Sequence, residues 1–131
     1  MAETTPLRFS PDHLYVRPAG QDAVIGFTHF GQDHTSRVTA IELPAVGRSF
    51  RRGEPFGAIE AIKAVVDLSM PVSGTVVAVN QELRASPWHI NTDPYGEGWL
   101  VRVRLADPGE LDELQDEASY EANATWAPPQ R

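Results

Sequence analysis

The side chain best suited to covalent chemistry in this sequence is a single lysine. Ten of the 11 basic residues are arginine, so Lys63 carries the only primary side-chain amine, and the N-terminal amine is its sole competitor. The chain contains no cysteine, which excludes disulfides, zinc–thiolate sites and thiol nucleophiles made from its own side chains. Acylation of a side-chain amine can therefore occur only at Lys63, and a redox-active sulfur would have to arrive on an attached group.

Other arrangements that could support catalysis or metal binding are incomplete. His29 stands at helical spacing from Asp33, but no third ligand lies nearby to complete a metal set. No Gly-x-Ser-x-Gly segment marks a nucleophile. Gly96-Glu97-Gly98 suits a turn better than a phosphate loop, because no helix N-terminus follows it. We therefore expect no metal site, and no nucleophile–base pair can be identified from the sequence.

The acidic residues are unevenly distributed. The net charge is −7, yet residues 107–121 contain seven acids and no base, which leaves the rest of the chain balanced. A phosphate backbone favours a basic stripe, and none is visible, so we expect no nucleic-acid partner. The acidic stretch predicts a solvated helix face, with a docking surface for a basic partner enzyme as the alternative.

Length and hydropathy limit the architecture further. The 131 residues are enough for one domain and too few for two independent cores. No segment approaches the roughly 20 apolar residues that a membrane span needs, and no basic-then-apolar leader opens the chain. These features predict a soluble, unprocessed, cytoplasmic protein with no membrane partner.

Short apolar or β-branched runs, separated by turn residues, predict a mainly β barrel or sandwich. Pro18–Asp22 predicts a hairpin turn, Thr28 is suited to cap a helix that ends near His34, and the acidic C-terminal stretch predicts further helical turns at 107–108 and 116–124. The predicted strands are Leu14–Arg17, Ala23–Phe27, Val38–Leu43, Glu54–Ile62, Ala64–Leu68, Val72–Val79 and Trp99–Leu105.

A chain reversal at Ile62-Lys63 is one of two interpretations of the run around the lysine, although no Gly, Asn or Pro adjoins Lys63. Taken alone, Ile59–Leu68 is compatible with one continuous strand or a buried helix. Either would bury an unpaired lysine among Ile and Val, which is costly. A reversal places the ammonium group at an exposed hairpin tip; the alternative is an ordinary lysine that snorkels from a strand.

Three stretches resemble the glycine cleavage system H proteins, in the order and spacing of that family. Glu60–Ala64, followed by Pro71-Val72-Ser73-Gly74, resembles the family's lipoyl-lysine hairpin. Asn91–Leu100 looks like the family's motif before its last barrel strand. Shorter matches extend the resemblance from about His13 to Tyr120: Ile41–Pro44, Gly53–Gly57, Val79-Asn80, Asp107–Leu111 and Ser119–Glu121.

The resemblance implies a mainly β, barrel-sandwich hybrid fold of the lipoyl/biotinyl type, with short helices that are mostly C-terminal. Residues 1–131 would form a single lipoyl-carrier domain, with a core at about 13–105 and an acidic helical segment at 107–124. Lipoate would be joined to Lys63 by an amide bond, as N6-lipoyllysine. The residues expected around this attachment site are Glu60, Ile62, Ala64 and Asp67.

The same resemblance implies a bacterial carrier protein without an active site. A lipoate ligase or lipoyl transferase would modify Lys63. The lipoyl arm would then take an aminomethyl group from glycine decarboxylase and deliver it to aminomethyltransferase, with dihydrolipoamide dehydrogenase as the third client. Tethering a reactive group in this way raises its effective concentration at each client enzyme.

Several departures from the family pattern leave a second client system open. A family glutamate near the N-terminus is Leu14 here, and an apolar side chain cannot accept a hydrogen bond from the amine of the cargo. Ala61 and Val66 replace small hydroxyl residues near the lysine. A related family of lipoate-binding proteins serves bacterial sulfur oxidation with heterodisulfide-reductase-like subunits. Sulfur transport is therefore the alternative function, with a plain interaction module and a hydrolase as less specific hypotheses.

Overall fold

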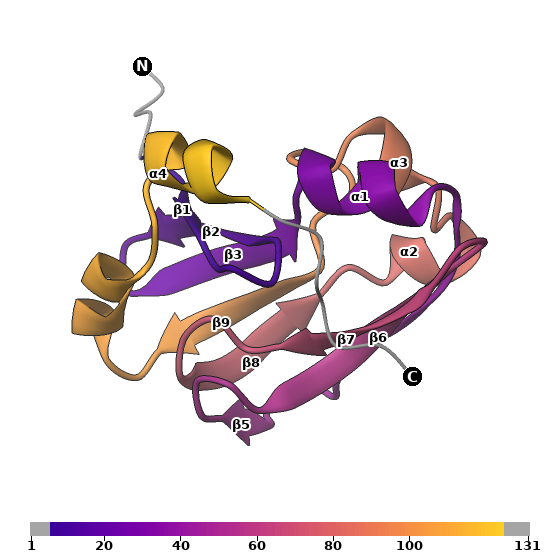
Figure 1. Ribbon diagram of the computed structural model, residues 1–131. Helices are drawn as coiled ribbons and strands as arrows, with labels where there is room; N and C mark the ends of the chain where they lie inside the picture. The colour runs from indigo at the N-terminus through magenta and orange to yellow at the C-terminus, as the bar shows by residue number, and fades with distance from the viewer. Residues whose placement is uncertain (1–5, 125–131) are drawn as a thin grey trace, which may run out of the picture.

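Nine strands form two antiparallel sheets in the computed structural model of the chain, which describes residues 6–124 (Figure 1). The larger sheet has the order β1-β2-β3-β9-β8-β5, and the smaller has the order β4-β6-β7. The strands are β1 (Arg8–Phe9), β2 (Leu14–Ala19), β3 (Asp22–Phe27), β4 (Val38–Glu42), β5 (Ser49–Phe50), β6 (Pro55–Ala61), β7 (Val65–Ser69), β8 (Gly74–Val79) and β9 (Val101–Leu105).

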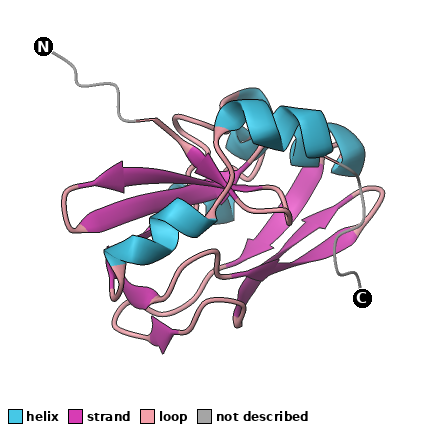
Figure 2. Cartoon of the chain, turned by 60° about the vertical axis from the view of Figure 1, so that its left-hand side comes forward, coloured by secondary structure: helices cyan, strands magenta, loops and turns pink. Residues whose placement is uncertain are grey.

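Short helical segments lie outside the two layers of strands (Figure 2). The segments are α1 (His29–Thr35), α2 (Glu82–Ala85), α3 (His89–Thr92), the 3-10 helix η1 (Pro108–Glu113) and α4 (Glu117–Asn123). Thr28 caps α1 as predicted, since its hydroxyl accepts a 3.1 Å hydrogen bond from the Gly31 amide. The prediction of mostly C-terminal helices missed α2 and α3. Each is a single turn without a side-chain cap, so neither carries a start signal.

The core lies between the two sheets and follows from the period-two alternation of the strands. On β9, Val101, Val103 and Leu105 point inward, while Arg102 and Arg104 point outward. The smaller sheet contributes Ile59 and Leu68 to the same apolar cluster. The predicted hairpin turn between β2 and β3 is confirmed, with Gly20 at a φ of 64° that glycine adopts readily.

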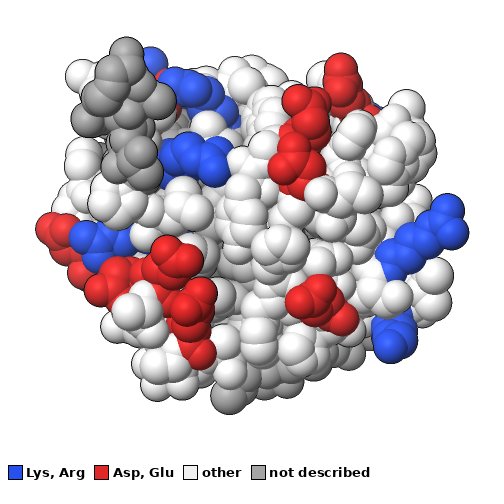
Figure 3. Space-filling view, turned by 90° about the horizontal axis from the view of Figure 1, so that it is seen from above, with Lys and Arg blue, Asp and Glu red and all other residues white. Residues whose placement is uncertain are grey.

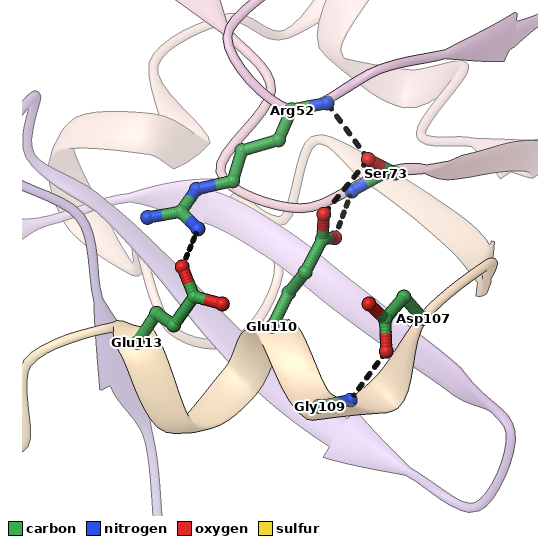
Figure 4. A network of polar contacts seen from close by, with 6 residues as sticks. All are labelled: Arg52, Ser73, Asp107, Gly109, Glu110 and Glu113. Atoms are coloured by element: carbon green, nitrogen blue, oxygen red, sulfur yellow. Dashed lines mark hydrogen bonds and ion pairs between the residues drawn. The ribbon is translucent and has the colours of Figure 1, made fainter.

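The acidic C-terminal stretch is fastened to the sheets by polar contacts (Figure 4). The Glu110 carboxylate accepts hydrogen bonds from the Ser73 amide at 2.7 Å and the Ser73 hydroxyl at 3.0 Å. The Arg52 guanidinium forms an ion pair with Glu113, and the Arg52 amide donates to the Ser73 hydroxyl at 2.9 Å. Five of the seven acids in this stretch have a hydrogen-bond or ion-pair partner, which the prediction of a solvated face did not anticipate: Asp107, Glu110, Asp112, Glu113 and Asp116.

Helix α4 closes the fold against the first residues of the described chain. The Tyr120 hydroxyl lies 2.7 Å from His13 Nδ1 and 2.8 Å from the Thr28 hydroxyl, and its ring stacks on Phe9. Burial raises the pKa of Tyr120 to about 12, so the hydroxyl stays protonated. Seen from above, the charged side chains of this side of the molecule form separate groups with uncharged surface between them (Figure 3).

Candidate functional site

Lys63 lies at the tip of the hairpin formed by β6 and β7. The hairpin closes with a 2.9 Å hydrogen bond from the Ala61 amide to the Ala64 carbonyl, and Ile62 and Lys63 form the exposed tip between them. Ile62 retains 65% of its exposed area although it is apolar. The predicted chain reversal is confirmed, and the alternative of a lysine that snorkels from a continuous strand is wrong.

Tertiary contacts explain why this turn forms without turn residues. The Ile62 amide donates to the Arg37 carbonyl at 3.0 Å, and the Lys63 amide donates to the Thr35 carbonyl at 3.4 Å. Both acceptors belong to residues 35–38, which join α1 to β4 and which we call the α1–β4 linker. The tip amides are therefore satisfied by a distant segment of the chain, not by local turn chemistry.

The strands of the hairpin turn acidic residues away from the core. Ile59 pairs with Val66 on the inner side, whereas Glu60 pairs with Val65 and Asp67 pairs with Ala58 on the outer side. Glu42 of β4 pairs with Ala58 and so faces the same way. We call Glu42, Glu60 and Asp67 the acidic face. Sequence reasoning identified Glu60 and Asp67 but missed Glu42, because only strand pairing brings β4 beside β6.

The α1–β4 linker is itself held by Asn91 of α3, which lies beside α1 (Figure 1). Asn91 Oδ1 accepts a 2.8 Å hydrogen bond from the Val38 amide. Asn91 Nδ2 donates to the Ser36 carbonyl and to Gln32 Oε1, each at 2.9 Å. Ser36 adopts a φ of 66°, which is unusual for a residue with a Cβ atom. The sequence marked Asn91 only as part of a motif and gave it no role.

Comparisons with known proteins agree with this arrangement. The family model of the glycine cleavage H-protein matches residues 7–125. The chain belongs to the glycine cleavage H-protein family. It is similar to the glycine cleavage system H protein of Symbiobacterium thermophilum, with 47% identity over 88% of this chain and 91% of the relative. It is also 44% identical to the mitochondrial glycine cleavage system H protein 2 of Arabidopsis thaliana, over 87% of this chain and 73% of the relative.

A solved structure supports the same family assignment for this H protein. The crystal structure of a glycine cleavage system H protein from Mycobacterium marinum superposes with a TM-score of 0.81 and 29% identity, over 92% of this chain and 97% of that one. The resemblance stated from the sequence and its mainly β fold class are therefore confirmed. The sulfur-oxidation alternative gains no support, because the relatives named above are H proteins of glycine cleavage.

Leu14, which the family resemblance marks as a departure from the family pattern, lies inside the core of the protein. Its side chain is fully buried at the start of β2, where Tyr15 and Val16 are also buried, so this part of the strand is covered on both faces. A side chain at this position therefore has no access to a group carried on the surface. The partly exposed Asp12, two residues earlier, lines a cleft of about 160 Å³ together with Ser10 and Ser69.

Residues 6–124 contain no group of three or more His, Asp or Glu side chains placed to hold a metal ion. None of the helices in that range is long and apolar enough to cross a membrane. Ion pairs within 4.0 Å in the same range involve arginines only, so Lys63 forms none there.

Proposed function

We propose that this protein is a non-catalytic lipoyl carrier of the glycine cleavage system, with lipoate joined to Lys63 by an amide bond. The observation that carries the proposal is the placement of the chain's only lysine, which is exposed at the tip of a hairpin in an H-protein fold. In this role the protein carries an aminomethyl group from glycine decarboxylase to aminomethyltransferase. Dihydrolipoamide dehydrogenase is the third client, and the expected compartment is the bacterial cytoplasm.

The residues at the tip fit the attachment of lipoate. The Lys63 amine is exposed and forms no ion pair among the described residues, so it is open to acylation by a lipoate ligase or lipoyl transferase. Amide formation joins the lysine nitrogen to the acyl carbon and removes the positive charge. Bound lipoate supplies a redox-active disulfide, which this cysteine-free chain lacks.

The side chains around the lysine have separate roles in this proposal. Ile62 and Ala64 keep the tip uncharged on both sides of Lys63, so that an enzyme can close around the lysine without desolvating a second charge. The outward-facing Glu60 and Asp67 attract a basic modifying enzyme. The hairpin holds the attached group in reach of successive clients, which raises its effective concentration at each one.

Because Leu14 is buried, the amine of a carried aminomethyl group must bind to carboxylates elsewhere on the surface. Asp67 lies on the outer face of β7, and Asp12 lines the cleft next to Ser69, the last residue of that strand. We assign the role of the missing family glutamate to these two residues. A carboxylate that accepts a hydrogen bond from an ammonium group contributes roughly 1.5–3 kcal/mol when solvent is excluded.

The test is intact mass after expression with a lipoate ligase and lipoate. The wild-type chain is expected to gain one lipoyl group and Lys63→Arg none, because arginine keeps the charge but is not acylated in the same way. Peptide mapping separates Lys63 from the N-terminal amine. A lipoyl group that persists in Lys63→Arg would contradict the proposed site, and an unmodified wild type would contradict the proposed function.

A further inference from the structure

We propose that Asn91 is a positioning residue for Lys63. This inference rests on the proposed function, because it concerns how the lysine is presented to the enzymes that modify and use it. Asn91 does not belong to the hairpin, and its side chain forms hydrogen bonds with residues 32, 36 and 38. Its effect on the lysine passes through the α1–β4 linker.

The first step of the argument is that the tip depends on the linker. A two-residue turn made of isoleucine and lysine has no side chain that stabilises it locally. Its two amides instead donate to the Arg37 and Thr35 carbonyls, at 3.0 and 3.4 Å. A displacement of the linker would remove both acceptors at once, and the tip would lose its defined position.

The second step is that the linker depends on Asn91. The side chain accepts from the Val38 amide and donates to the Ser36 carbonyl, so it holds the residues on both sides of Arg37. Arg37 is the residue whose carbonyl receives the Ile62 amide. Ser36 has a φ of 66°, a conformation that residues other than glycine rarely keep without support. Asn91 supplies that support from outside α1 and β4.

The third step is that Asn91 is itself anchored to the larger sheet. The Tyr15 hydroxyl of β2 donates to the Pro94 carbonyl at 2.7 Å, and Arg17 of the same strand donates to the Tyr95 carbonyl at 2.8 Å. These two contacts connect β2 of the larger sheet, through residues 91–95 and the linker, to the lysine on the smaller sheet.

Asn80 provides the matched control for Asn91. Both are asparagines whose side-chain amides hold backbone groups of other segments, but Asn80 Nδ2 donates to the Glu97 and Trp99 carbonyls, at 2.7 and 2.8 Å, and does not contact the linker. Asn80 is also the more buried of the two, with 6% of its area exposed. Asn80→Ala therefore reproduces the loss of a buried amide without releasing the linker.

The first measurement is amide hydrogen exchange of the unmodified protein by NMR. In Asn91→Ala, exchange of the Ile62 amide is expected to rise about tenfold beyond any rise at Val103, an amide of the buried β9 strand. In Asn80→Ala the ratio of the Ile62 exchange rate to the Val103 exchange rate is expected to match that of the wild type. An unchanged ratio in Asn91→Ala would overturn the positioning role, because a purely structural residue lowers protection globally.

The second measurement is the rate of modification by a lipoate ligase, at a temperature where all variants are folded. Asn91→Ala is expected to lower the catalytic efficiency about tenfold, mainly through a higher KM, while Asn80→Ala stays near the wild type. Should Asn91→Ala fail to fold, Asn91→Asp gives the same comparison, since it keeps the acceptor for the Val38 amide and loses both donors. Equal rates for the Asn91 and Asn80 variants would overturn the inference.

The two experiments separate this inference from the proposed function. Hydrogen exchange needs no lipoate, so it decides the mechanical role of Asn91 even if the wild type is never modified. A wild type that is modified normally, together with an Asn91→Ala variant that is modified equally well and keeps its Ile62 protection ratio, would refute the positioning role alone.

Discussion

The outer faces of the two sheets differ in the charged side chains that they carry and in the partners of those side chains. On the larger sheet, Arg102 and Arg104 of β9 point outward and both bond to Asp22 of the neighbouring strand, at 3.0 and 2.7 Å. On the smaller sheet, the acidic face points outward beside the tip that bears Lys63. Charges on the larger sheet thus connect strands to one another, whereas those on the smaller sheet lie along the outer face of the hairpin that bears Lys63. The net charge of −7, which belongs to the whole chain, therefore does not give the charge of either outer face.

The largest expected effect comes from placing an acidic side chain at a buried position of the larger sheet. Leu14→Glu would put a carboxylate into the core at a fully buried position of β2 and is expected to destabilise the protein by about 3 kcal/mol or more. Urea unfolding measures this loss. Leu14→Met, with a similar volume, is the control and should cost less than about 1.5 kcal/mol.

This result also bears on the cargo. The resemblance places a family glutamate at this position, but the burial of Leu14 predicts that Leu14→Glu destabilises the protein. A variant as stable as the wild type would show that residue 14 reaches solvent, and the assignment of the amine contact to Asp12 and Asp67 would then be wrong.

An intermediate effect is expected from neutralising part of the acidic face. Glu60→Gln combined with Asp67→Asn should slow modification of Lys63 about fivefold at an ionic strength of about 0.01 M, where electrostatic steering is strong. At about 1 M the Debye length falls to about 3 Å, and the difference should disappear. The matched control is Glu117→Gln combined with Glu121→Gln, which removes the same charge from α4. If the two pairs slowed modification equally, or neither did, the acidic face would have no docking role.

The smallest effect concerns Asp22 and depends on pH. Its two arginine partners hold the pKa of the Asp22 carboxyl below its usual range. The ionised carboxylate therefore stabilises the folded state at neutral pH, and this contribution is lost as the pH falls through the lowered pKa. Asp22→Asn should lower the Tm by a few degrees at about pH 7, with a difference that shrinks toward about pH 3. Glu60→Gln, the same change on the other sheet, should leave the Tm nearly unchanged; an equal loss in both would remove the contrast between the faces.

Features that depend on alternation or on an unfavourable burial could be predicted from the sequence. The pattern of valine and arginine in β9 gives its inner and outer sides directly. The cost of burying an unpaired ammonium group favours a reversal at Lys63, but it leaves a lysine that snorkels from a strand as the alternative, and the family resemblance decided between the two. Only the alternation in β9 can be interpreted from neighbours in the chain alone.

Features that depend on distant partners could not be predicted in this way. The acceptors of the tip amides lie at Thr35 and Arg37, and their support comes from Asn91, so no local pattern reveals them. Family resemblance identified Leu14 as a substitution, but only the sheet packing shows that β2 is covered on both faces there. Glu42 joined the acidic face for the same reason, through the pairing of β4 with β6.

The closure of the fold by its C-terminal stretch has a consequence for biosynthesis. Strand β1 lies at the edge of the larger sheet, and Phe9 exchanges backbone hydrogen bonds of 2.8 and 2.9 Å with Gln115, while Tyr120 reaches His13 and Thr28. These partners follow β1 by more than 100 residues along the chain. On the ribosome, the emerging chain must therefore leave one side of β1 unpaired until residues 115–120 have been made, and an open strand edge is a template for aggregation. Truncation before residue 115 would leave that edge open permanently.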